Sequence, residues 1–215
     1  YHSRITGGGT SDDVSGSGDQ VKGAKQLEFA GNGSSSNPYV LYLGGWFAHN
    51  LQIHTATPSA TISTPSYFSS MLSNGYLAKM ALGGAHTTPS SVDWLVKQGG
   101  SLSSGTFQLP QLSYHNQQLF VGGTMKMTID FPPLTATTPT THSTAAVYGE
   151  VDISNGAFKW IKMIAGDRDV YCSAVSWVGN GLMAAGGFAG TADFGVTSLT
   201  VTGTQSWKWD PYFTR

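Results

Sequence analysis

Hydrophobic and polar residues alternate along two adjoining segments near residue 150. Over residues 147–153 the odd positions are apolar or small up to Ile153, and Tyr148, Glu150 and Asp152 stand between them. Over residues 158–163 the positions alternate again, Phe158, Trp160 and Lys162 with Lys159, Ile161 and Met163. A period of two is typical of a β-strand, and Asn-Gly is the strongest short signal for a hairpin turn. Because Asn155-Gly156 separates the two segments, the pattern predicts an antiparallel β-hairpin.

The same signals recur along the chain. Asn-Gly also occurs at residues 32–33, 74–75 and 180–181, and the last of these pairs predicts a hairpin that joins Tyr171–Val178 to Leu182–Phe188. Further strands are predicted at Gln26–Ala30, Tyr39–Leu43, Leu51–Thr55, Tyr76–Leu82, Leu119–Gly122, Met125–Ile129 and Val196–Val201. Many short strands separated by Gly, Pro and Ser are typical of an all-β protein. We therefore expect a single antiparallel β-barrel or sandwich domain with long loops, and the pattern does not choose between the two.

One segment has the signals of a helix. Ser90 stands at a capping position, Asp93 follows three residues later, and Gly99-Gly100 provides a stop. The pattern predicts a short helix over residues 90–98, and we expect at most one or two short helices in the chain.

Two segments are expected to be loops. Residues 1–20 form a flexible N-terminal lead-in, because residues 5–20 are rich in Gly, Ser and Asp. The single β domain then covers residues 21–215. Residues 131–146 contain three prolines, which a central strand does not accept. This long loop is either a solvated connection or an exposed recognition loop.

Charged residues are scarce. The chain has 11 Lys and Arg and 12 Asp and Glu, which is 11% of its residues, and its net charge is −1; an average soluble domain has about 25% charged residues. Gly, Ser and Thr number 28, 25 and 23, so the polar surface consists mainly of hydroxyls, amides and backbone. A nearly neutral chain has no long-range field to attract phosphate, which argues against nucleic acid as a partner. No apolar run approaches the about 20 residues of a membrane helix, so membrane insertion is not expected.

Cys172 is the one cysteine of the chain, so no internal disulfide can form. A chain without disulfides is typical of folding in a reducing compartment, followed here by a role outside the cell. The chain begins at Tyr1 with neither an initiator Met nor a signal-peptide pattern, so we expect a fragment of a longer protein.

A search for catalytic and metal-binding patterns finds no complete set. Serines and six histidines are present, but the chain contains neither Gly-Asp-Ser-Gly-Gly nor Gly-x-Ser-x-Gly. His49 and His54 are five positions apart, which places them on opposite faces if one strand carries both. Glu150 and Asp152 share a strand face, as paired glycosidase acids would, but beside a turn we expect a solvated edge. No enzyme activity, metal or cofactor is therefore predicted, and we expect Cys172 to be a buried small residue.

Aromatic residues make up 12% of the chain, which is high beside so few charges. The alternation predicts Phe29, Tyr42, Phe120, Phe158 and Trp160 for the core. Tyr and Trp in loops or at strand ends offer a large contact area at a small entropy cost. The residues predicted to contact a receptor are Tyr67, Trp94, Tyr114, His115, Trp207 and Trp209. Trp207 and Trp209 have an alternative, which is packing inside the end of a strand.

The segment Gly166-Asp167-Arg168-Asp169-Val170-Tyr171-Cys172-Ser173-Ala174-Val175-Ser176-Trp177, with the Asn-Gly hairpins, resembles the capsid projection (spike) domain of astroviruses, those of birds included. The resemblance implies a homodimer of compact β domains on the virion surface, made in the host cytoplasm and acting outside the cell. It also implies contact with a host-cell receptor, protein or glycan, linkage to the capsid shell domain of the same precursor, and proteolytic maturation.

Two other readings of the residues remain open at this stage. A carbohydrate-binding β module of a phage or bacterium would also combine neutral polar residues with aromatic side chains. A hydrolase on a β scaffold is the alternative of a different class.

Overall fold

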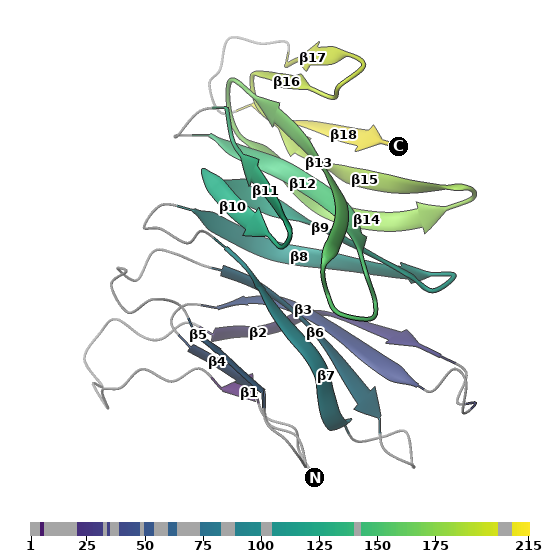
Figure 1. Ribbon diagram of the computed structural model, residues 1–215. Helices are drawn as coiled ribbons and strands as arrows, with labels where there is room; N and C mark the ends of the chain where they lie inside the picture. The colour runs from purple at the N-terminus through teal and green to yellow at the C-terminus, as the bar shows by residue number, and fades with distance from the viewer. Residues whose placement is uncertain are drawn as a thin grey trace.

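The computed structural model describes residues 5–6, 21–31, 34, 39–47, 50–53, 60–63, 74–82, 89–99, 105–139, 143–201 and 208–215, and among these residues it contains strands and no helix. Every strand pair is antiparallel, and no sheet closes on itself. The prediction of an all-β fold is thus confirmed, as a layered sandwich. Figure 1 shows the layers stacked from β1, β4 and β5 at one end to β16 and β17 at the other. No helix of the described residues is long and apolar enough to cross a membrane.

The sheets are as follows. The four-stranded sheet has the order β2 (Val21–Ala30), β3 (Val40–Phe47), β6 (Asn74–Leu82) and β7 (Pro89–Gln98). The six-stranded sheet has the order β17 (Ser198–Thr200), β16 (Thr191–Asp193), β13 (Phe158–Gly166), β12 (Thr144–Val151), β9 (Gln118–Lys126) and β8 (Thr106–His115). Two three-stranded sheets have the orders β14 (Val170–Val178), β15 (Gly181–Phe188), β18 (Asp210–Thr214) and β1 (Ile5–Thr6), β4 (Asn50–Ile53), β5 (Ala60–Ser63). β10 (Thr128–Phe131) and β11 (Leu134–Thr137) form a separate pair.

Each interface between layers has its own hydrophobic core. The largest lies between the four-stranded and six-stranded sheets and includes Tyr42, Leu77 and Phe107. A second core, with Tyr148 and Cys172, lies between the opposite face of the six-stranded sheet and β14–β15–β18. The third packs β4 against the four-stranded sheet. The six-stranded sheet is therefore covered on both faces, which explains why β9 and β12 are buried along almost their whole length.

Both predicted hairpins are confirmed. β12 pairs with β13 around the turn at Asn155-Gly156. β14 pairs with β15, and Val178 stands opposite Gly181, so Gly179 and Asn180 are the turn residues. Of the predicted core aromatics, the side chains of Tyr42, Phe120 and Phe158 are buried and that of Trp160 is half-buried. The side chain of Phe29 lies outside the described residues.

The predicted helix over residues 90–98 is wrong, because this segment is strand β7. It pairs with β6, and Trp94 and Gln98 are buried on one face while Leu95 packs against the opposite core. Valine and tryptophan favour a pleated strand, and pairing with β6 outweighs the weak local capping signal.

The predicted loop over residues 131–146 is also only partly right. β10 and β11 form a hairpin, and Pro132-Pro133 occupies its two-residue turn. Prolines at that place remove no ladder hydrogen bond. β12 then begins at Thr144, so the loop covers a much smaller part of the segment than predicted.

Other boundaries differ from the predictions. Asn74-Gly75 begins β6 instead of forming a turn, and one strand, β9, runs through the gap predicted between Gly122 and Met125. The strands β5, β8, β16 and β18 were not predicted. Of the predicted lead-in, the structure describes Ile5 and Thr6, which pair with β4. Asn32-Gly33 lies outside the described residues.

Phe107 provides a test of the main core. Its side chain is fully buried and makes an edge-to-face contact with Phe131, with a distance of 5.1 Å between the ring centroids. We expect Phe107→Ala to lower the free energy of unfolding by about 3–5 kcal/mol, because a buried ring leaves a cavity. Urea denaturation followed by tryptophan fluorescence measures the change. Gln108→Ala, an exposed neighbour, is the control and should change stability by less than about 0.5 kcal/mol; equal effects would contradict this packing.

Candidate recognition surface

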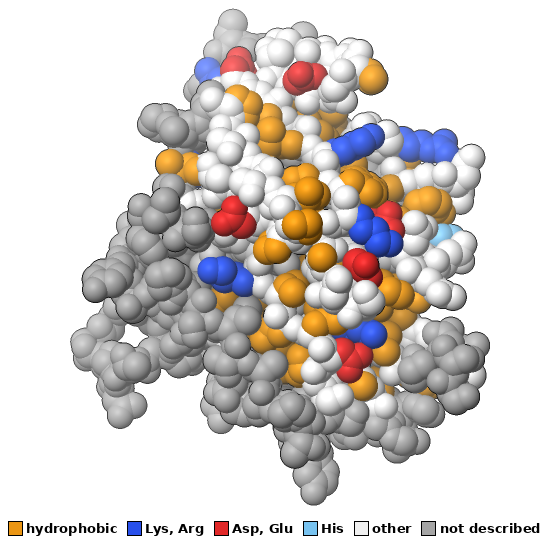
Figure 2. Space-filling model, in the orientation of Figure 1, with side chains coloured by type: hydrophobic (Ala, Val, Ile, Leu, Met, Phe, Trp, Pro, Cys, Tyr) orange, Lys and Arg blue, Asp and Glu red, His pale blue; other side chains and the backbone are white. Residues whose placement is uncertain are grey.

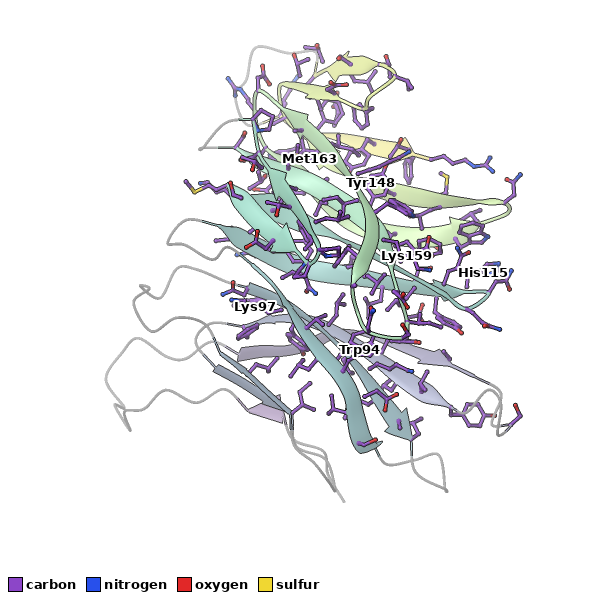
Figure 3. The ribbon with its side chains drawn as sticks, viewed as in Figure 1. Trp94, Lys97, His115, Tyr148, Lys159 and Met163 are labelled. Carbon is purple, nitrogen blue, oxygen red and sulfur yellow. The ribbon has the colours of Figure 1, made fainter. Side chains whose placement is uncertain are left out.

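Two of the predicted receptor contacts belong to the core. The Tyr114 ring stacks on Tyr42 with a centroid distance of 5.6 Å, and Tyr42 lies 6.1 Å from Trp94. The Trp94 side chain is buried, and its Nε1–H donates to the carbonyl oxygen of Ile153 at 3.0 Å. As Figure 3 shows, Trp94 lies between two layers. Trp94 is therefore a core residue and not an exposed loop or strand-end residue as expected, and half-buried Tyr114 packs against the same core.

His115 follows Tyr114 at the end of β8, where the chain turns into β9, and its side chain lies on the opposite face of the strand from the core column (Figure 3). Its ring stacks on Trp177 of β14, with 5.3 Å between centroids and 10° between planes. Phe120 stacks on the same indole at 5.3 Å. The turn residues Asn116 and Gln117 have φ values of 47° and 61°, which aligns β8 and β9 as a tight hairpin. His115 is thus half-buried at the surface, as part of a ring stack that joins two layers.

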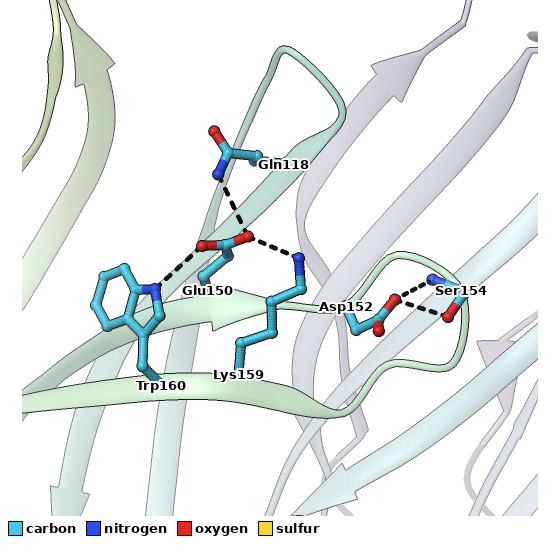
Figure 4. Close-up of polar contacts among 6 residues, drawn as sticks. All are labelled: Gln118, Glu150, Asp152, Ser154, Lys159 and Trp160. Atoms are coloured by element: carbon cyan, nitrogen blue, oxygen red, sulfur yellow. Dashed lines mark hydrogen bonds and ion pairs between the residues drawn. The ribbon is translucent and has the colours of Figure 1, made fainter.

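A buried carboxylate next to this stack holds a second tryptophan in place (Figure 4). Glu150 on β12 accepts hydrogen bonds from Lys159 Nζ at 2.9 Å, Trp160 Nε1 at 3.0 Å and Gln118 Nε2 at 3.3 Å. The side chain of Glu150 is 11% exposed, so the expectation of a solvated edge is wrong. β12 is central in its sheet, and the donors from β9 and β13 replace the water that the carboxylate loses.

The charge of Glu150 is stabilised by these donors. Burial alone would raise its pKa, but the hydrogen bonds from Lys159, Trp160 and Gln118 and the positive charge of Lys159 outweigh burial and hold the pKa below its ordinary value. The hydrogen bond to Glu150 in turn raises the pKa of Lys159. At neutral pH this carboxylate is ionised and fully engaged, which suits a lock between strands and not a proton donor.

The outermost layer carries exposed aromatic side chains. Tyr171, Trp209 and Phe213 are 40%, 44% and 75% exposed. The register of β14, β15 and β18 places Tyr171, Pro211 and Phe213 on one face, and Trp209 lies against Tyr171 with 5.0 Å between ring centroids. We call Tyr171, Trp209 and Phe213 the aromatic face. Predicted contact Trp209 belongs to it, whereas Tyr67 and Trp207 lie outside the described residues.

Cys172 and Asp169 are both engaged in packing or hydrogen bonding between strands. Cys172 is buried in the second core, and burial raises the pKa of its thiol to about 11. Asp169 accepts from Thr144 N at 2.7 Å, which joins β12 to the start of β14. Among the described residues no three His, Cys, Asp or Glu side chains come together in a way that could hold a metal ion.

Charged side chains are sparse on the surface of the described residues. Figure 2 shows that the viewed face is mostly uncharged, with few Lys, Arg, Asp and Glu side chains among apolar and neutral ones.

No protein-family model, curated protein or solved structure matches this chain. Sequence reasoning missed Trp177, Tyr171 and Phe213, although each stands at a regular alternating position of a strand.

Replacing Glu150 by Gln tests the lock. Because the pKa of Glu150 is lowered in the folded state, its stabilising effect is complete above the unfolded value of about 4.3 and is lost as the pH falls through the folded value. We expect Glu150→Gln to be less stable than the natural protein by about 1–2 kcal/mol at pH 7. The difference should shrink as the pH is lowered below about 4. Urea denaturation over this pH range measures it, and a difference that stays constant down to pH 3 would contradict the lock.

Cys172 provides a test of chemical inertness. With a thiol pKa of about 11 and a buried side chain, we expect labelling by a disulfide reagent at pH 8 to be at least about a hundredfold slower in the folded protein than in urea. Absorbance of the released thiolate measures the rate, and the unfolded protein should give one thiol per chain. Labelling of the folded protein at the unfolded rate would show that the thiol is accessible.

Proposed function

We propose that this chain is the projection (spike) domain of a viral capsid, which acts as a homodimer and attaches the virion to a receptor on the host cell. In this proposal the domain is joined to the capsid shell domain of the same precursor, is made in the host cytoplasm, acts on the virion surface and is not an enzyme. The resemblance of residues 166–177 and the hairpins to astrovirus spikes supports the viral assignment.

The observation that carries the proposal is the aromatic face. Tyr171, Trp209 and Phe213 are exposed on a paired, three-stranded sheet, so they offer a large apolar contact area that is already ordered. Isologous interfaces bring the same patch of two copies together, and an uncharged patch does so without repulsion between like charges. We therefore assign the aromatic face to self-association, including Trp209, which the sequence had suggested for receptor contact.

The positions of two lysines support proteolytic maturation. Between Lys25 and Lys126, trypsin-like cleavage is possible at Lys79 and Lys97. Both lie inside paired strands, β6 and β7, and Lys79 Nζ forms an ion pair with Asp93 at 3.1 Å. Cleavage at such sites requires local unfolding, so the folded domain is suited to survive the protease that releases it.

Sedimentation and cell binding test the proposal together. We expect the natural protein to be a dimer at micromolar concentration and Phe213→Asp to be a monomer, because the dimer would bury an unpaired charge. The labelled dimer should bind cultured vertebrate epithelial cells saturably. The variant should bind them at least about tenfold more weakly, because the second contact of a bivalent ligand is lost.

Val196→Asp is the matched control. Val196 is 97% exposed in the turn between β16 and β17, away from the aromatic face, and its replacement should leave the dimer intact. A natural protein that sediments as a monomer and binds no cells would overturn the proposal. A dimer that survives Phe213→Asp would remove the assignment of the aromatic face.

A further inference from the structure

The six-stranded sheet extends beyond the layer that covers it, and a hollow remains at that end. The hollow has a volume of about 430 Å³, and its walls come from β13, β16, β17 and the residues after β11. In Figure 1 this region lies at the end of the stack opposite β1, β4 and β5. None of the predicted receptor contacts is part of it.

The floor of the hollow continues the main core. Met163 and Ala165 on β13 pack against that core, but they are half-buried and also line the hollow. Figure 3 shows Met163 in this upper part of the six-stranded sheet. Because side chains alternate along a strand, residues 163 and 165 share the core-facing side with Asp193, which stands directly opposite Ala165 in the register. Ser198 is directly opposite Asp193 on the next strand. An apolar floor is thus bordered by polar side chains on one sheet face.

Two carboxylates at the border are held by the backbone. Asp167 Oδ1 accepts from Thr191 N at 2.7 Å, and Asp193 Oδ1 accepts from Gly195 N at 2.7 Å. Oδ2 of each carboxylate has no partner among the described residues. Asp167 lies next to Thr191 at the end of β13, so the two aspartates are diagonal neighbours, with Cα atoms roughly 7–8 Å apart. They therefore offer two acceptors, each held by a backbone N–H, beside Ala165 of the floor.

We propose that this hollow binds one neutral sugar residue of a host glycan. Met163 and Ala165 suit the C–H face of a pyranose ring, and the carboxylates of Asp167 and Asp193 would accept hydrogen bonds from its hydroxyl groups. Ser198 at the border supplies a group that can both donate and accept. This inference rests on the proposed attachment function and gives its receptor a chemical class.

The lining also discriminates against other ligands. No Lys or Arg is among the described residues that line the hollow, so a sialic acid or a sulfated sugar would bring its anion to two carboxylates without compensation. A calcium ion prefers six to eight oxygen ligands, and here each carboxylate already uses one oxygen for a backbone N–H.

Glycan binding by the full chain tests the proposal. The probes are a printed array of neutral and sialylated oligosaccharides, followed by calorimetry with galactose, N-acetylgalactosamine, N-acetylglucosamine, fucose, mannose and glucose. We expect at least one neutral sugar to bind with a Kd of about 1 mM, which is typical of a single small contact site. Asp193→Asn should weaken binding by at least about tenfold, because a charge-assisted hydrogen bond is lost. Ser198→Trp should abolish it by filling the hollow.

Asp152→Asn is the matched control. Asp152 Oδ1 accepts from Ser154 N at 2.8 Å, two residues ahead, as Asp193 accepts from Gly195 N, but it lies in the turn between β12 and β13. This control should bind sugar like the natural protein, and thermal melting should show that all three variants remain folded. Binding of sialylated glycans alone, of calcium, or of an arginine-rich peptide in place of sugar would overturn the proposal. Neutral-sugar binding that survives both Asp193→Asn and Ser198→Trp would also overturn it.

Cell binding separates this inference from the proposed function and identifies the source of the sugar. Loss of binding after enzymatic removal of N-linked glycans points to glycoproteins, and loss after inhibition of glycolipid synthesis points to glycolipids. Saturable binding to cells with no affinity for any sugar would leave the attachment function intact and overturn the sugar site. Sugar affinity without any cell binding would support the sugar site and overturn the attachment function.

Discussion

Burial of the six-stranded sheet on both faces is the constraint on which the other layers depend. In β9 and β12 almost every side chain is buried, so apolar residues point into a core on each side. An antiparallel sheet usually leaves one face to solvent, whereas this one requires a covering sheet on both. Gly122 and Gly123, at adjacent positions of β9, leave room for large side chains on the two faces of the sheet. A Cβ atom on Gly122 would collide with Val175 of β14, and one on Gly123 would collide with the Phe107 ring.

The shortage of charge follows from the same constraint. Interfaces between neutral layers leave few places where an ion is solvated, and carboxylates near them need fixed donors. Glu28 on β2 accepts from Tyr114 N at 3.2 Å and thereby joins the four-stranded sheet to β8. Glu150 joins three strands of the central sheet. These two glutamates are thus engaged in holding strands and layers together.

Local pattern predicted the elements whose alternation and turn lie next to each other in the chain. In the hairpins β12–β13 and β14–β15, an Asn-Gly pair is flanked on both sides by segments that alternate with a period of two. No distant contact was therefore needed to predict them. Residues 90–98 failed because Ser90 and Asp93 give a local helical signal, while pairing with β6, which the sequence does not show, decides the outcome. The expected exposure of Trp94 failed for a related reason. Whether Trp94 or Phe213 is exposed depends on which sheet face another layer covers, and alternation within one strand cannot tell a covered face from a free one.

The two candidate contact surfaces lie where the stacking of layers ends. The outer side of β14–β15–β18 has no further sheet over it among the described residues, and its alternating positions therefore leave Phe213 exposed. The hollow lies where β13 and β16 extend past their cover, so Met163 and Ala165 continue the core into open space. The outer face of β14–β15–β18 thus yields an apolar surface suited to a second copy, and the uncovered part of the six-stranded sheet yields a small amphipathic site. The two surfaces belong to different sheets, so in the proposed homodimer one sheet would face the second copy and the other the receptor.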